Sequence, residues 1–213
     1  MKLSEGEIGG ICGIVQTLVG HPMDTIKVWI QNKKNIDLQI NKLYRGIYPP
    51  LLTHFGIGYF LFGSTDYFNK YFDNYFISGF ISGLGIAPLM NSSEYLKINQ
   101  QMNMKKITSN ILLKGLNITL IREGIGSSSY FGSYFYLKDY LNPFIAGGIG
   151  GMLSWVCTYP LDVIKTRVQC YPHDHTYLSA LKMGNLWNGI GITMLRGFIV
   201  NGSVFYVYDF LKK

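Results

Sequence analysis

Residues 20–31, GHPMDTIKVWIQ, carry an acid and a base at helical spacing. Asp24 lies two residues after Pro22, Lys27 three residues after the acid, and Gln31 four residues after the base. Side chains three or four residues apart share one face of a helix and can form an ion pair there. A single such pair more often marks a solvated helix face than a contact between helices.

The same spacing occurs three times in the chain. The second copy is Ser92, Glu94, Lys97 and Gln101, and the third is Pro160, Asp162, Lys165 and Gln169. A Gly-x-x-x-Gly pair precedes each copy by a constant distance: Gly9 and Gly13, Gly79 and Gly83, Gly147 and Gly151. Such internal repeats determine the fold before local propensities do. We expect a single domain over 1–213, with repeats of about 1–71, 72–141 and 142–213.

The composition favours a membrane protein with a polar interior. Apolar residues make up 48% of the chain and charged residues only 15%, against about a quarter in soluble domains. Mean hydropathy is nevertheless only +0.16, and no apolar run reaches the length of a simple membrane span. Helices that face lipid on one side and a water-filled interior on the other would give this balance.

Several other classes of protein are disfavoured. The net charge is +7, but the basic residues are dispersed, so we expect no nucleic-acid partner. Cys12, Cys157 and Cys170 have neither disulfide-framework nor zinc spacing. His173 to His175 read as an exposed polar turn, so we expect no metal. No nucleophile triad, P-loop or dinucleotide fingerprint is present, which argues against an enzyme and against a cofactor. We also expect no signal peptide.

Each repeat reads as two helices with a short polar link, such as Asn32–Lys42. The expected helices are Ile8–Gln31, Ile47–Asn69, Tyr75–Gln101, Leu116–Lys138, Phe144–Gln169 and Ile190–Lys212. Helices of this length can cross a bilayer with some tilt. Proline removes a backbone donor, so we expect a break or kink at Pro22.

The second helices of the repeats also align with one another. Counted from Gly46, Gly115 and Gly189, equivalent positions hold Thr53, Arg122 and Arg196; Asp66, Phe135 and Asp209; and Asn69, Lys138 and Lys212. Ionisable residues in the middle of a membrane helix usually serve function. Arginines that snorkel to the membrane surface are the structural alternative.

These residues resemble the mitochondrial carrier family over essentially the whole chain. That family repeats Pro-x-[Asp/Glu]-x-x-[Lys/Arg] three times. Its second motif, [Phe/Tyr]-[Asp/Glu]-x-x-[Lys/Arg], is complete in Tyr208, Asp209 and Lys212, and half kept in Tyr134 with Lys138. VGHPMDTIKV and LIREGIG look most like the branch that carries acylcarnitine and basic amino acids.

The resemblance implies an all-α membrane protein with six transmembrane helices in three pseudo-symmetric two-helix repeats around a central cavity. It would be a monomeric, multi-pass protein of the mitochondrial inner membrane, with both termini in the intermembrane space and cardiolipin as a possible bound lipid. The repeats are shorter than is usual in the family, so the short matrix-side helix of each should be largely missing.

The resemblance also implies two gates. At the matrix end Asp24 would pair with Lys97, Glu94 with Lys165, and Asp162 with Lys27, braced by Gln31, Gln101 and Gln169. At the cytoplasmic end Lys138 would pair with Asp209 and Lys212 with Asp66, beside Tyr134 and Tyr208. Asn69 would face Phe135, which makes this gate the weaker one.

Six substrate contacts are implied between the gates. They are Thr53, His54, Ile57, Arg122, Glu123 and Arg196. Arginine binds carboxylates bidentately, so Arg196 would take a carboxylate and Glu123 an amine or quaternary ammonium. Arg122 would be held by Glu123 or shared with the substrate.

The expected function is transport of carnitine, acylcarnitine or a basic amino acid such as ornithine by alternating access, as an antiporter. Carriers of S-adenosylmethionine or of a keto acid would share both arginines and are the first alternative. A degenerate carrier-fold protein that does not transport is the second, suggested by the shortened links and the incomplete cytoplasmic gate.

Overall fold

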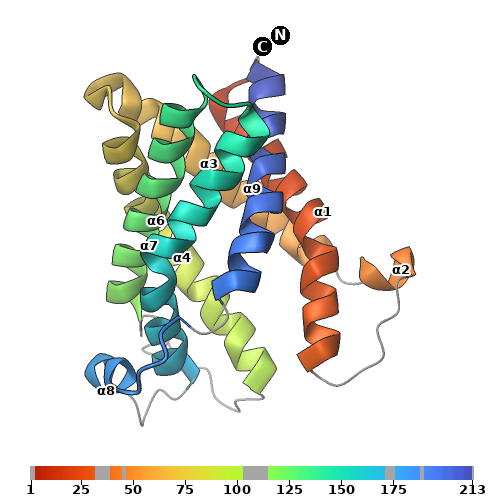
Figure 1. Cartoon of the computed structure of the whole chain (residues 1–213), viewed down its shortest axis with the longest axis vertical. Helices are drawn as coiled ribbons and strands as arrows, with labels where there is room; N and C mark the ends of the chain where they lie inside the picture. Colours follow the sequence, from red (N-terminus) through yellow and green to blue (C-terminus); the bar gives the residue numbers. More distant parts are fainter. Residues whose placement is uncertain are drawn as a thin grey trace.

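Six long helices form a closed ring in the part of the chain that the computed structural model describes, residues 3–31, 39–44, 47–102, 115–170, 176–187 and 190–212. They are α1 (Glu5–Gln31), α3 (Tyr48–Phe72), α4 (Tyr75–Met102), α6 (Leu116–Leu137), α7 (Pro143–Cys170) and α9 (Ile190–Lys212). Each packs against the next along the chain, and α9 returns to α1 (Figure 1). The expected all-helical class is confirmed, and every expected helix limit lies within three residues of the observed one.

The prolines do not end the helices. α1 stays helical through Pro22, and so does α7 through Pro160, so the expected break at Pro22 is wrong. A proline costs a helix one backbone hydrogen bond. Neighbouring helices and side-chain hydroxyls can satisfy the released carbonyl in a packed bundle.

Two links contain short helices that the sequence did not predict. α2 (Ile40–Leu43) lies in the first link and α8 (Tyr177–Lys182) in the third. Thr176 and Ser179 form a reciprocal capping box at the start of α8, which satisfies two helix-end donors. Residues 103–114 of the middle link and His173 to His175 lie outside the described residues.

The helices of each pair touch through backbone. The pairs in contact are Gly9 with Gly58, Gly79 with Ser127, and Gly147 with Asn201. Each partner lies 12 residues after the glycine that aligns its helix, namely Gly46, Gly115 and Gly189. A side chain on any of these first glycines would overlap a backbone oxygen of the partner helix. Small residues permit this close helix approach.

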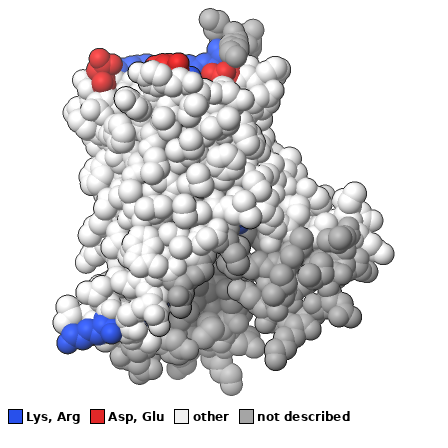
Figure 2. Space-filling view, viewed as in Figure 1, with Lys and Arg blue, Asp and Glu red and all other residues white. Residues whose placement is uncertain are grey.

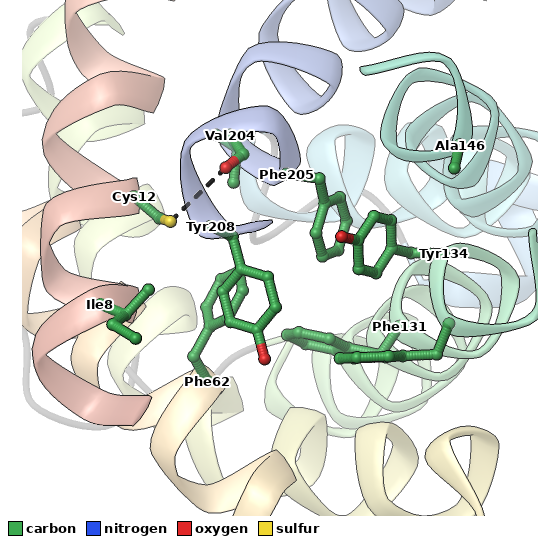
Figure 3. Packing of buried hydrophobic residues seen from close by; sticks show 10 residues of the cluster. Ile8, Cys12, Phe62, Phe131, Tyr134, Ala146, Val204, Phe205 and Tyr208 are labelled. Carbon is green, nitrogen blue, oxygen red and sulfur yellow. Dashed lines mark hydrogen bonds between the residues drawn. The ribbon is translucent and has the colours of Figure 1, made fainter. Parts of the chain in front are cut away.

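The largest apolar core closes one end of the ring. We call it the aromatic cap and define it as Phe62, Phe131, Tyr134, Phe135, Phe205 and Tyr208, all buried. Tyr134 stacks on Phe205 at 3.6 Å between ring centroids, and Phe62 meets Phe131 edge-on at 4.9 Å (Figure 3). These residues come from the C-terminal halves of α3, α6 and α9. The aromatic cap therefore lies at the end that carries both termini, the terminal end (Figure 1).

The outer wall is poor in charge between the two ends on the face that Figure 2 shows. In Figure 2 the charged side chains gather at the terminal end, with a further basic one near the opposite end. Large apolar side chains are exposed along the wall, as at Leu52, Phe55 and Tyr59 of α3, at helical spacing. Among the described residues, one segment, Pro143–Lys165, is long and apolar enough to cross a membrane by length and composition.

Candidate functional site

Arg122 is buried in α6 and bridges two carboxylates. Its Nη1 donates to Oδ1 of Asp162 on α7 at 2.7 Å, and its Nη2 donates to the adjacent Glu123. The exposed fraction is 10% for the Arg122 side chain, 15% for Glu123 and 30% for Asp162. A charge leaves water at low cost only when it is paired, and the donor fork of arginine can serve two carboxylates. This ion cluster therefore ties α6 to α7 inside the ring.

A polar cavity of about 240 Å³ lies beside the ion cluster. α1, α4, α6, α7 and α9 all contribute to its walls. Its lining includes Gln16, Arg122, Glu123, Trp155, Arg196 and Asn201. The three charged residues among these are three of the six predicted substrate contacts, so the structure brings them to one cavity.

Arg196 reaches the polar cavity from α9, which α7 separates from α6 in the ring. Its guanidinium packs over Gly20 of α1, where a Cβ would lie 3.1 Å from Nη2. The glycine thus leaves room for the arginine head. The cavity consequently has the Glu123 carboxylate on its α6 side, next to the Arg122–Asp162 pair, and a second guanidinium on its α9 and α1 side.

Aromatic and amide groups complete the lining. Trp155 packs against Gly197, where a Cβ would lie 2.9 Å from its Cδ1, and Tyr130 lines the cavity from α6. Aromatic faces attract cations through the ring quadrupole. Gln16 and Asn201 offer amide groups that can both donate and accept hydrogen bonds. Such a lining can hold the two ends of a small dipolar solute.

A second cavity of about 170 Å³, the cap cavity, adjoins the first. The two share Gln16, Met90, Glu123, Tyr130 and Asn201. Cys12, Phe62 and Val204 line the cap cavity, and all three belong to the core around the aromatic cap. The cavities therefore end at the aromatic cap, which closes them toward the terminal end.

The three contacts predicted on α3 differ in position. Ile57 lines the cap cavity. Thr53 is exposed, and neither it nor His54 lines either cavity. The His54 ring instead lies 2.8 Å through Nδ1 from Oγ1 of Thr17 on α1. Because Gly13 packs against the His54 carbonyl, the ring lies at the seam between α1 and α3.

The predicted matrix gate is described only in its third copy. Lys165 is 1% exposed, and Asp162 binds Arg122 at the polar cavity. The other side chains of this gate and its brace lie outside those the structure describes: Asp24, Lys27, Glu94, Lys97, Gln31, Gln101 and Gln169. The structure thus places one gate acid within reach of the substrate site.

The cytoplasmic gate differs from the expected pairing. Asp66 binds Lys70, one turn along its own helix, at 3.0 Å. Lys212 binds Glu5 at 2.7 Å, so the expected Lys212–Asp66 pair is not formed. Lys138 lies over the ring of Phe135, with 4.8 Å from Nζ to the centroid, a contact that the motif did not predict.

Tyr134 and Tyr208, which were predicted to lie beside the cytoplasmic gate, both belong to the aromatic cap. Tyr208 donates its hydroxyl to Glu5 at 2.9 Å. The buried Tyr134 hydroxyl has no hydrogen-bond partner among the described residues. Such a group pays a desolvation cost, so Tyr134 contributes to the closed terminal end through the packing of its ring.

Glu5, Gln16, Tyr130 and Trp155 are the functional candidates that the sequence reasoning missed. Glu5 is a polar residue at the start of a helix and has no equivalent in the other repeats. Comparison of the repeats therefore could not identify it. Tyr130 and Trp155 could have been found as aromatic residues within the helices that carry the predicted site. No group of three His, Cys, Asp or Glu that could hold a metal occurs among the described residues.

Comparison with known proteins finds similarity to mitochondrial carriers. The family model described as Mitochondrial carrier protein matches residues 139–213. The mitochondrial arginine transporter BAC2 of Arabidopsis thaliana is 28% identical over 262 residues, covering 96% of this chain and 88% of that protein. The mitochondrial carnitine carrier of Saccharomyces cerevisiae is 28% identical over 274 residues, covering 94% and 83%.

A third relative matches a shorter stretch at higher identity. The mitochondrial ornithine transporter 1 of Rattus norvegicus is 35% identical over 121 residues, which cover 46% of this chain and 40% of that protein. The two long alignments exceed the 213 residues of the chain. These relatives therefore carry extra residues inside the aligned region, in keeping with the short repeats seen here.

Proposed function

From its similarity to mitochondrial carriers, we propose that the chain belongs to that family and moves a small solute bearing a carboxylate and a cationic group across the mitochondrial inner membrane. The movement is an exchange by alternating access. The six long helices each cross the membrane, in three related pairs around the cavities. The charge-poor outer wall and the shared glycine packing support this arrangement.

The observation that carries the proposal is the distribution of charge around the polar cavity. Glu123 lines it from α6, Asp162 of α7 binds the lining residue Arg122, and Arg196 enters from α9. Arg122 offsets one of the two carboxylates, which leaves a negative side and a positive side. A solute with its carboxylate at Arg196 and its cation at Glu123 matches both sides.

Size and aromatic lining support the same class of solute. A volume of about 240 Å³ lies just below the roughly 300–1,000 Å³ of pockets for drug-sized ligands, which suits a compact metabolite. Trp155 and Tyr130 offer ring faces to an ammonium or guanidinium group. The relatives named for arginine, carnitine and ornithine support a basic amino acid or carnitine as the substrate.

Asp162 gives substrate binding a route to the gate. It is the acid of the third gate motif, yet it binds Arg122 in the ion cluster. A cationic solute group that enters the cluster competes with Arg122 for Glu123 and Asp162. Release of Asp162 toward its gate partner would then favour closure of the matrix end. A ligand shifts a conformational equilibrium only through such differential contacts.

Thermal unfolding of the purified protein with candidate solutes tests the proposal. Arginine, ornithine or carnitine should raise the unfolding temperature, because a ligand at 100 times its Kd adds about 2.7 kcal/mol of stability. The rise should vanish in Glu123→Gln and persist in Asp139→Asn, which changes an exposed carboxylate just after α6.

Two outcomes contradict the proposal. One is a flat response to every solute from protein that unfolds cooperatively. The other is stabilisation of Glu123→Gln by a keto acid or S-adenosylmethionine to the same extent as the parent, since that solute would not use the proposed cation site.

A further inference from the structure

The first and last helices meet at the terminal end through three polar side chains. Glu5 Oε1 lies 2.7 Å from Lys212 Nζ, and Glu5 Oε2 accepts from the Tyr208 hydroxyl at 2.9 Å. Lys212 Nζ also donates to the Tyr208 hydroxyl oxygen at 3.0 Å. Each of the three groups therefore contacts the other two. We call this set the latch.

The latch is continuous with the aromatic cap. Tyr208 is 4% exposed and packs against Phe62, with 5.2 Å between ring centroids. Lys212 lies 5.3 Å from the centre of the Tyr208 ring. The ring of Tyr208 thus belongs to the aromatic cap (Figure 3). Its hydroxyl is bound by the latch. Moving α1 away from α9 breaks the Glu5–Lys212 ion pair and the hydrogen bond from Tyr208 to Glu5 together.

Asp66 is not available to Lys212 in this arrangement. Its carboxylate binds Lys70 on the same helix, so this pair joins no two helices. Glu5 is the acid that binds both Lys212 and Tyr208, across the seam between α1 and α9. Charge-assisted hydrogen bonds of this kind are stronger than neutral ones.

We propose that Glu5 is the acid that positions Tyr208 and Lys212 and so holds the terminal end closed. The family resemblance implied this role for Asp66. The role of Glu5 as a gate residue rests on the proposed alternating access. The closed contact itself needs no solute. Opening of the terminal end requires the latch to part before the rings of the aromatic cap separate.

The chain contains its own reporter for this opening. Cys12 is 0% exposed, lines the cap cavity and donates from Sγ to the Val204 carbonyl at 3.5 Å (Figure 3). A water-soluble maleimide can reach this thiol only when the core around the aromatic cap loosens. Replacing Cys157 and Cys170 by serine leaves Cys12 as the thiol to be labelled.

The experiment measures the labelling rate of Cys12 in detergent-solubilised protein without solute. Glu5→Gln should accelerate labelling about tenfold or more, the effect of losing one charge-assisted bond. Glu7→Gln, a matched change on an exposed neighbour whose carboxylate accepts from Ser4, should leave the rate unchanged. Asp66→Asn should also leave it unchanged.

Two further variants distinguish a gate role of Glu5 from a general loss of protein stability. Ala180→Cys places a thiol at a 0% exposed site outside the aromatic cap, in a second apolar cluster, and labelling of this introduced thiol should not change with Glu5→Gln. Charge reversal, Glu5→Lys with Lys212→Glu, should return Cys12 labelling toward the parent rate.

The proposal is overturned if Glu5→Gln labels Cys12 at the parent rate, if Asp66→Asn accelerates labelling as much, or if Cys12 and the thiol introduced by Ala180→Cys accelerate together. Because no solute is present, each of these results leaves the proposed transport function untouched. A failed solute response likewise leaves the latch intact.

Discussion

Replacing Arg122 by glutamine removes the positive charge from the middle of the ion cluster. Glu123 and Asp162 then remain as two carboxylates that Arg122 had bridged. Glutamine keeps part of the aliphatic stem and can still donate hydrogen bonds, although it is shorter than arginine. The perturbation is therefore mainly electrostatic, with a smaller loss of packing.

The expected loss follows from burial. Removing one partner of a buried ion pair costs about 3–5 kcal/mol, because the remaining charge stays desolvated. Asp162 is 30% exposed, so water can screen part of the repulsion, and we expect a loss near the lower end, about 3 kcal/mol. For a chain of this size about 1 kcal/mol shifts the midpoint by roughly 2–4 °C, so Tm should fall by about 6–12 °C.

Thermal unfolding of Arg122→Gln beside two other variants tests this reasoning. The triple variant Arg122→Gln, Glu123→Gln, Asp162→Asn should regain much of the loss, since it removes the three charges of the ion cluster together. Lys182→Gln changes an exposed residue at the end of α8. The free energy of unfolding of this variant should lie within about 0.5 kcal/mol of the parent value. The reasoning is refuted if Arg122→Gln unfolds within about 2 °C of the parent, or if the triple variant is no more stable than the single one.

Three further outcomes are expected. Gly83→Ala should destabilise the protein by about 1–3 kcal/mol in chemical unfolding, since its Cβ would overlap the Glu123 carbonyl. Gly56→Ala, where a Cβ would meet nothing within 4 Å, should be neutral or stabilising by up to about 1 kcal/mol. Equal effects of the two substitutions would contradict the packing. Tyr134→Phe should change stability by less than about 1 kcal/mol, because its hydroxyl has no partner among the described residues; a larger loss in the same assay would reveal one. Trp155→Leu should weaken binding of a cationic solute by about 2- to 30-fold in calorimetry, from about 0.5–2 kcal/mol of cation–π attraction, and unchanged affinity would place the cation elsewhere.

The long helices and the charged part of the site could be predicted from the sequence. Three in-register copies of one motif fixed the helix order. Arg122, Glu123 and Arg196 were identified because ionisable residues in the middle of an apolar helix need a polar surrounding. All three line the same cavity. The register of the second helices held because close glycine contacts allow little sliding.

The partners of these charges could not be predicted in the same way. Lys212 of α9 binds Glu5 on the adjoining helix α1, whereas Asp66 lies on α3, which does not adjoin α9 in the ring, and binds Lys70. Asp162 follows the repeat motif in sequence but binds Arg122 from another repeat. A pattern within one helix gives the face of a side chain, whereas its partner depends on the distance between helices.

Exchange of labelled arginine, ornithine or carnitine in liposomes that contain the purified protein is the most direct test of a carrier for solutes with a carboxylate and a cation. We predict uptake of at least one of them that requires unlabelled solute inside and is lost in Arg196→Gln, with Asp139→Asn as active as the parent. Correctly folded protein that exchanges none of the three, or an Arg196→Gln variant that exchanges at the parent rate, would contradict the account.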